Sequence, residues 1–207
     1  MVYPWKQMEG HKSLYFSSDF LWARQALYVF GLWIAMRVVE RKAPLSLILF
    51  FLIGSFFSFD WALSLETHWF SNMYGFLYLS SGAQAAMSLM VFRGFKDNDI
   101  PTKKDLVHLL LTISLLWFYL NFSQFIIIWM GNLPREAGWY VERMTGWTLL
   151  VWFIFGALKL VPIFLISFFK NYKIKNQLIQ GISLLIFLGF ILEMIWLLLP
   201  SMQGVHS

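Results

Sequence analysis

Two carboxylates and a histidine, Asp60, Glu66 and His68, lie together between two long apolar runs of this chain. A carboxylate costs roughly 2.5–3.5 kcal/mol at the centre of an inserted membrane helix and less near the interface. Because histidine titrates near neutral pH, this group could move protons. Asp60 is read either as an interfacial carboxylate paired with a donor, or as a proton-handling group beside a quinone. His68 is read as an interface histidine or a proton relay, and Glu66 as a solvated rim residue.

Lys159 and Glu193 are a second pair of ionisable residues, and each lies inside a strongly apolar stretch. Pro162 frees the backbone carbonyl of Leu158, which a lysine ammonium could bind. Alternatively, Lys159 could snorkel or reach Glu193, which would lie roughly 9 Å shallower at 1.5 Å rise per residue. The two residues therefore predict either a buried ion pair or part of a proton path.

Polar side chains also recur at helical spacing within two other apolar stretches. One stretch carries four polar or amphipathic residues three or four positions apart, which places them on one helix face: Ser114, Trp117, Asn121 and Gln124. The other carries Gln84 among small residues that let helix backbones approach closely. This pattern is compatible with a hydrogen-bonded helix seam and with the lining of a polar path.

The composition indicates an integral membrane protein. Of its 207 residues, 59% are hydrophobic, 20% aromatic and only 13% charged, with a mean hydropathy of +0.63. Soluble domains carry about 25% charged residues. The absence of cysteine excludes disulfides, thiolate metal sites, cysteine-ligated iron–sulfur clusters and cysteine-attached haem. The four histidines have no short ligand spacing, which disfavours a haem held between paired histidines.

About six apolar stretches are long enough to cross a bilayer, since a spanning helix needs roughly 20 residues. No stretch alternates as a membrane β-strand would, so helices are expected. The first stretch is the weakest, because Arg24 and Arg37 bracket its short apolar centre. Short polar connections predict an all-α bundle that forms one transmembrane domain over residues 1–207, with spans at 21–39, 45–65, 70–92, 106–130, 146–169 and 178–199.

The distribution of basic residues predicts the orientation of the bundle. Most of the 16 Lys and Arg residues follow the first, third and fifth spans, and such residues favour the cytoplasmic side. Both termini are then expected on the outer, periplasmic side. The formal charge of +5 is explained by these connections, so no nucleic-acid partner is expected. Residues 1–19 lack the apolar core of a signal peptide, which predicts a translocated short tail or a preceding segment.

The connection at 129–140 is expected on the outer face, the same face as His68 and Trp69. Its Asn-Leu-Pro sequence predicts a turn, and its Trp and Tyr residues are typical of headgroup anchors. A solvated loop and a docking surface for a partner protein are equally compatible with this sequence. The candidate docking residues are Trp69, Asn132, Arg135, Glu136, Trp139 and Tyr140.

Several segments, taken together in their order and spacing, resemble the F subunit (ActF) of bacterial alternative complex III. The segments that carry the resemblance cover nearly the whole chain: His11 to Tyr15 with Phe20 and Arg24, Phe59-Asp60-Trp61, Ser64-Leu65, His68-Trp69-Phe70, Phe122-Ser123-Gln124, Trp129, Gly131-Asn132-Leu133-Pro134 and Trp139-Tyr140. The family's F subunit is about twice as long, so the chain resembles its C-terminal half.

The resemblance implies a subunit of a quinol:electron-acceptor oxidoreductase in the bacterial inner membrane. It implies that this chain binds no redox cofactor, that haem c and iron–sulfur clusters lie on partner subunits, and that a quinone is bound nearby. The chain would then be a non-catalytic subunit with a structural or proton-conducting role. Two other functions stay open: a quinol-binding subunit of the NrfD or polysulfide-reductase type, in which Asp60 and His68 accept protons, and a small secondary transporter that uses Lys159 and Glu193 as a coupling pair.

Overall fold

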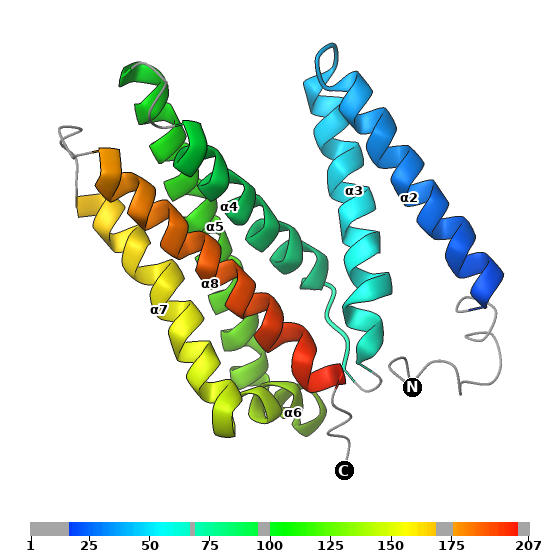
Figure 1. The fold of residues 1–207 in the computed structure, drawn as a ribbon. Coiled ribbons are helices and arrows are strands. Elements are labelled where there is room, and N and C mark those ends of the chain that lie inside the picture. Colours follow the sequence, from blue (N-terminus) through cyan, green and yellow to red (C-terminus); the bar gives the residue numbers. More distant parts are fainter. Residues whose placement is uncertain (1–16, 67–68, 95–99, 169–175, 203–207) are drawn as a thin grey trace. The chain divides into compact units, whose positions relative to one another are not determined.

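The computed structural model describes residues 17–66, 69–94, 100–168 and 176–202, and all regular structure within these ranges is helical (Figure 1). The prediction of an all-α protein is therefore confirmed for this part of the chain. In sequence order the elements are α2 (Ser18–Val38), α3 (Ala43–Trp61), the short 3-10 helix η2 (Leu63–Leu65), α4 (Tyr74–Gly94), α5 (Ile100–Gly131), α6 (Pro134–Arg143), α7 (Gly146–Phe168) and α8 (Asn176–Met202).

Five of these helices are long and apolar enough to cross a membrane: Ala43–Leu65, Tyr74–Gly94, Thr102–Gly131, Gly146–Leu165 and Gln177–Leu198. The chain is therefore a multi-pass membrane protein. Helix α2 forms over the first predicted span, but Arg24, Gln25 and Arg37 keep it outside this apolar group. Its crossing and the side of the termini stay predictions.

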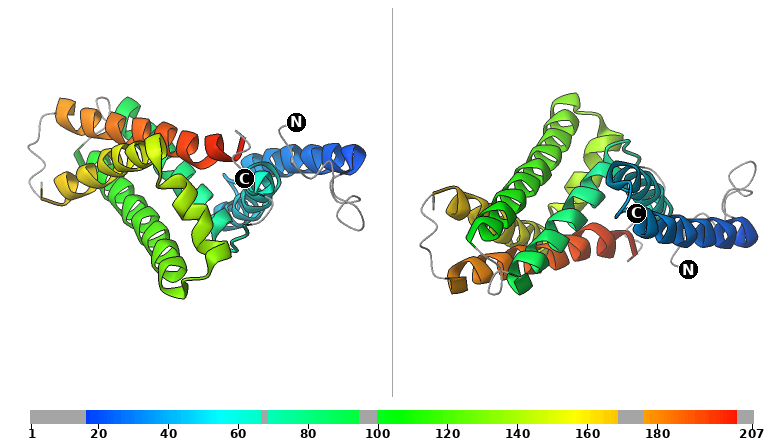
Figure 2. Two further views of the ribbon diagram at one scale, coloured as in Figure 1. Left: turned by 90° about the horizontal axis from the view of Figure 1, so that it is seen from below. Right: turned by 90° about the horizontal axis from the view of Figure 1, so that it is seen from above.

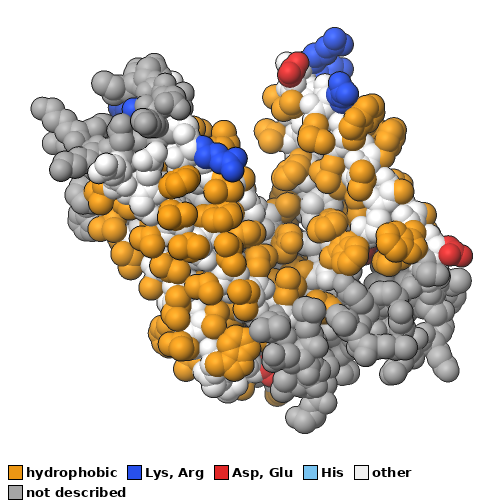
Figure 3. Space-filling view, viewed as in Figure 1, with side chains coloured by type: hydrophobic (Ala, Val, Ile, Leu, Met, Phe, Trp, Pro, Cys, Tyr) orange, Lys and Arg blue, Asp and Glu red, His pale blue; other side chains and the backbone are white. Residues whose placement is uncertain are grey.

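The exposed helix surfaces are dominated by large apolar side chains, among them Trp22, Met130 and Phe164. Figure 3 shows hydrophobic side chains along the helix flanks, with Lys and Arg near helix ends. A water-facing protein of this size would bury most of such a surface, whereas a bilayer requires it on the outside.

The chain divides into two compact units, Met1–Leu79 and Ser80–Ser207, and the boundary falls inside α4. In the first unit α2 packs along α3. Ser46 in α3 donates a hydrogen bond from Oγ to the Ala35 carbonyl at 2.8 Å, and Gly31 leaves room for the side chain of Ile53. The expectation of one transmembrane domain stays a prediction.

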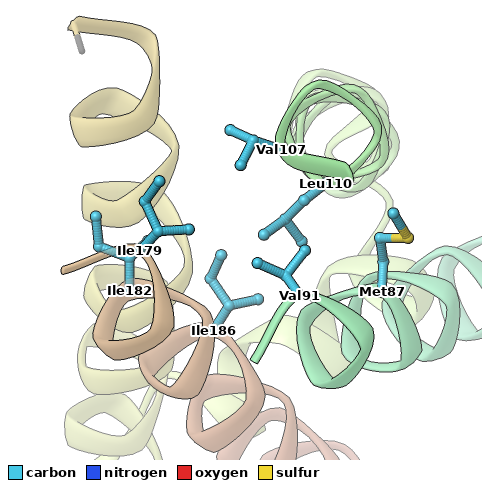
Figure 4. Close-up of a cluster of buried hydrophobic side chains, with 7 residues drawn as sticks. All are labelled: Met87, Val91, Val107, Leu110, Ile179, Ile182 and Ile186. Carbon is cyan, nitrogen blue, oxygen red and sulfur yellow. The ribbon is translucent and has the colours of Figure 1, made fainter. Parts of the chain in front are cut away.

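In the second unit α7 and α8 run antiparallel and pack along each other, and α5 contacts α7 (Figure 2). Nearer the α8 N-terminus lies an apolar cluster of buried side chains from α4, α5 and α8. Figure 4 shows Val91, Leu110 and Ile186 pointing toward one another within this cluster, whose members are Met87, Val91, Val107, Leu110, Ile179, Ile182 and Ile186. Val91, Leu110 and Ile186 are fully buried.

The expectation of a loop at 129–140 was wrong for most of that segment. Helix α5 continues to Gly131, and α6 begins at Pro134. Asn132 takes a left-handed conformation with φ of 44°, which asparagine tolerates better than most residues. Pro134 then suits the first turn of a helix, where its missing N–H costs nothing. The Asn-Leu-Pro turn is present, but it joins two helices.

Candidate functional site: a buried lysine–glutamate pair

Lys159 in α7 and Glu193 in α8 form a buried ion pair in the second unit. Lys159 is 0% exposed and Glu193 4% exposed. The Lys159 Nζ atom donates to Glu193 Oε2, and it also donates to Ser81 Oγ at 2.9 Å. The ion pair that was one of the expected outcomes for these residues is therefore formed, and the ammonium is directed at the carboxylate.

Ser81 and Trp117 complete the cluster from the two remaining membrane helices of this unit. The Ser81 hydroxyl accepts from Lys159 and donates to Glu193 Oε2. The Trp117 indole donates from Nε1 to Glu193 Oε1 at 2.9 Å, and its ring lies 4.1 Å from the Lys159 ammonium. Each of α4, α5, α7 and α8 thus supplies one side chain of a single contact group.

The cluster satisfies the main physical requirements for charge inside a low-dielectric interior. The opposite charges neutralise each other, both carboxylate oxygens accept hydrogen bonds, and the indole face stabilises the cation. Removing either partner would leave one buried charge without compensation. A hydroxyl that both accepts from the acid and donates to the base also has the geometry of a proton relay.

The direction of the lysine side chain explains how it reaches Glu193. Side chains in a helix lean toward its N-terminus. The α7 N-terminus lies at the same end of the hairpin as the α8 C-terminus (Figure 1), and Glu193 lies in the C-terminal half of α8. The Lys159 stem therefore leans in the direction in which Glu193 is found.

The predicted polar face of α5 is confirmed as a buried face at three of its four positions. Ser114, Trp117 and Gln124 are buried, and Asn121 is half-buried. Gln84 in α4 donates from Nε2 to Ser114 Oγ at 2.9 Å, which is the interhelical hydrogen bond expected of a seam. Asn121 donates to the Trp117 carbonyl in its own helix. A role for Gln84, Asn121 and Gln124 in a proton path stays a prediction.

Asp60 is a buried carboxylate of the first unit. Its Oδ2 atom accepts from Arg24 Nε at 2.9 Å and from the Tyr28 hydroxyl at 2.7 Å. The interpretation of Asp60 as a carboxylate paired with neighbouring donors is therefore confirmed. Its role beside a quinone stays a prediction, and His68 lies outside the described residues. Tyr28 was not among the residues predicted from the sequence, although Arg24 and Tyr28 are four residues apart on one helix face.

Because residues 134–143 form helix α6, the docking candidates in this segment differ in how far they are exposed. Trp139 is buried against Trp196, with ring centroids 5.6 Å apart, and beneath the Arg143 guanidinium, 4.1 Å from its ring. Trp139 is thus an internal contact of this unit, and a docking role for it stays a prediction. Trp69 is likewise buried, within the first unit.

The other docking candidates in this region remain accessible to different extents. Asn132 is exposed, whereas Glu136 and Tyr140 are half-buried; the side chain of Arg135 lies outside the described part. Burial raises the pKa of the Tyr140 phenol above its usual value, and the nearby Arg143 charge opposes this shift. A docking role for these residues stays a prediction.

Arg143 was not found by the sequence analysis, although it is almost fully buried. Its guanidinium donates to the Trp139 carbonyl and to the Leu197 carbonyl of α8, both at 3.3 Å. The Trp196 indole donates to the Arg143 carbonyl at 3.0 Å. Arg143 therefore ties α6 to α8. Its position in an apparent loop hid this role, because loop arginines are normally solvated.

The fold and the buried pair define a class, a multi-pass α-helical membrane protein with an intramembrane ion pair. Comparison with the known protein families and with the curated proteins finds no match to this chain. Within the described residues, no three His, Asp or Glu side chains lie close enough together to hold a metal ion.

Proposed function

We propose that this chain is a membrane subunit of an alternative complex III-type quinol:electron-acceptor oxidoreductase, with a buried Lys159–Glu193 pair that handles protons. The proposal includes six spans with both termini on the outer side of a bacterial inner membrane. It gives this chain no redox cofactor: haem c and iron–sulfur clusters would lie on partner subunits, and a quinone would bind nearby. The family assignment rests on the resemblance of the sequence segments.

The observation that carries the proton-handling role is the contact group of Lys159, Glu193, Ser81 and Trp117. Ionisable residues inside membrane spans are costly and commonly mark proton or ion pathways. Glu193 can take up a proton only if the ion pair loosens, and the Ser81 hydroxyl touches both partners. Proton uptake would therefore be coupled to a rearrangement of three helices around Glu193.

Co-purification tests the assignment to a respiratory complex. The tagged full-length chain is extracted from its native membrane in a mild detergent, and the eluate is examined for haem absorbance, iron and associated polypeptides. We expect a multihaem cytochrome and a large iron–sulfur protein to elute with the chain. Recovery of the chain alone, without haem or iron, would overturn the assignment.

The proton-to-electron ratio of the purified complex tests the role of the pair. Glu193→Gln and Lys159→Met should lower proton translocation while the complex still assembles. Glu142→Gln is the matched control, because it makes the same chemical change at an exposed position of the same unit. An unaltered ratio in both assembled variants would contradict a proton-handling role.

A small secondary transporter is the second candidate, and the same ion pair favours it. Buried Lys–Glu pairs can couple a proton to a substrate by breaking and re-forming. The two functions differ in their genetic context and in their partners. Neighbouring genes for a multihaem cytochrome and a large iron–sulfur protein would support the respiratory subunit, whereas an isolated gene and a chain that purifies alone would support the transporter.

A further inference from the structure

Gly189 in α8 lies directly beside the stem of the Lys159 side chain. A Cβ atom added at Gly189 would meet Lys159 Cγ at 2.8 Å, Leu158 Cβ at 3.2 Å and the Phe155 carbonyl oxygen at 3.5 Å. By contrast, a Cβ added at Gly181 in the same helix would meet nothing within 4 Å. A side chain would therefore collide with its neighbours at Gly189 but would have free space at Gly181.

The spacing within α8 connects this contact to the ion pair. Gly189 and Glu193 are four residues apart, so they share a face and are separated by roughly 6 Å along the axis. The Lys159 stem crosses α8 at Gly189, and its ammonium then reaches Glu193 one turn further on. The part of the lysine side chain beyond Cγ is about long enough to span this one helical turn, so the ammonium has little freedom to reach further.

We infer that Gly189 is the positioning residue of the Lys159–Glu193 pair. Its missing side chain forms the slot through which the lysine stem passes, and this slot fixes the ammonium between Glu193, Ser81 and the Trp117 ring. A methyl group in the slot displaces Lys159 Cγ, which is too near the backbone to swing away freely. The positioning role of Gly189 rests on the proposed proton-handling function only where an effect on proton translocation is expected.

The competing explanation is that Gly189 is simply a small residue at a helix interface. Small residues at such positions allow close packing of membrane helices without any link to an ion pair. Leu158 and Phe155 are the contacts through which that effect would act. The two explanations differ in whether the cost of a side chain at Gly189 depends on Lys159.

The first experiment compares Gly189→Ala with Gly181→Ala in the full-length chain purified in detergent. The readout is the ¹⁵N–¹H resonance of the Trp117 indole, assigned with Trp117→Phe, since this N–H donates to Glu193. We expect Gly189→Ala to shift this resonance and Gly181→Ala to leave it in place. An unshifted resonance in a folded Gly189→Ala protein would overturn the inference.

The second experiment is a double-mutant cycle on the unfolding equilibrium, measured by denaturing-detergent titration. Overpacking by a methyl group typically shifts this equilibrium by roughly 5- to 150-fold. We expect a shift in this range for Gly189→Ala in the natural background. The same change should have at most a few-fold effect in a Lys159→Ala/Glu193→Gln background, which lacks the lysine Cγ. Equal shifts in both backgrounds would support simple helix packing and overturn the inference.

The cycle also covers the case in which Gly189→Ala does not fold by itself. Recovery of a folded protein when Lys159→Ala/Glu193→Gln is added would support the slot, and failure to recover would contradict it. The proposed function fails separately: if Glu193→Gln leaves the proton-to-electron ratio unchanged while the indole shift and the coupling are observed, Gly189 positions a pair that does not handle protons.

Discussion

Ser81 is the residue that joins the buried charges into one group. Its hydroxyl is in contact with both partners, so the lysine and the carboxylate share a neutral neighbour that can change the direction of its own proton. Trp117 binds the other carboxylate oxygen and covers the ammonium. With Lys159, these two residues hold Glu193 from three helices, α4, α5 and α7.

Replacing one partner of the ion pair should lower the free energy of unfolding more than replacing both partners. We expect Lys159→Met or Glu193→Gln to lower the free energy of unfolding by about 3–5 kcal/mol, because an uncompensated charge remains buried. The double variant Lys159→Met/Glu193→Gln should recover much of this loss. Detergent-unfolding titrations of the three variants measure the coupling, and additive losses would show that the pair is not energetically linked.

In the first unit, Asp60 should behave as a structural carboxylate. Asp60→Asn keeps an acceptor for Tyr28 but removes the charge that faces Arg24, and we expect a loss of about 1–3 kcal/mol in unfolding free energy. Tyr28→Phe should cost less, because the ion pair remains. Glu66→Gln, a change at a less buried carboxylate, is the control. An Asp60→Asn variant with an unchanged free energy of unfolding would contradict this structural role.

At the scale of elements, helix α6 is the one described helix that was not predicted from the sequence. Five of the six predicted apolar spans and the buried face of α5 followed from length and spacing, because a bilayer makes these patterns strict. Helix α6 is only ten residues long and mixes Arg, Glu, Gly and Trp. Its conformation depends on Arg143 and Trp196, which are 53 residues apart and contact each other only in the folded chain.

Tyr140 gives α6 a predicted response to alkaline pH. Burial raises the pKa of its phenol from the usual 10.0, so the neutral form is favoured in the folded state. The stability gained in this way is complete below pH 10.0 and is lost as the pH rises from there through the higher folded pKa. Unfolding titrations from about pH 8 to about pH 11 should therefore show a fall in stability.

Two tyrosine variants separate this effect from other alkaline titrations. Tyr140→Phe should reduce the fall, because phenylalanine has no proton to lose. Tyr119→Phe, at an exposed position of α5, should leave it in place. If the two variants respond identically to pH, burial of Tyr140 is not the cause.

For the molecule as a whole, the absence of cysteine offers a direct test of the proposed topology. Single cysteines at Ser17, Lys42 and Asn132 can be labelled with a membrane-impermeant maleimide in intact cells. If α2 crosses the membrane as proposed, Ser17→Cys and Asn132→Cys should react from outside, and Lys42→Cys only after lysis. Protection of both Ser17→Cys and Lys42→Cys in intact cells would show that α2 does not cross.

The order of helices in the chain gives the ion pair a consequence for biosynthesis. Lys159 and Glu193 lie on the last two described helices, which are consecutive. A lysine or a carboxylate entering lipid alone costs roughly 2.5–3.5 kcal/mol at the centre of a helix. If α7 and α8 enter the lipid together as a hairpin, the lysine and the carboxylate enter as a neutralised pair, which lowers this cost.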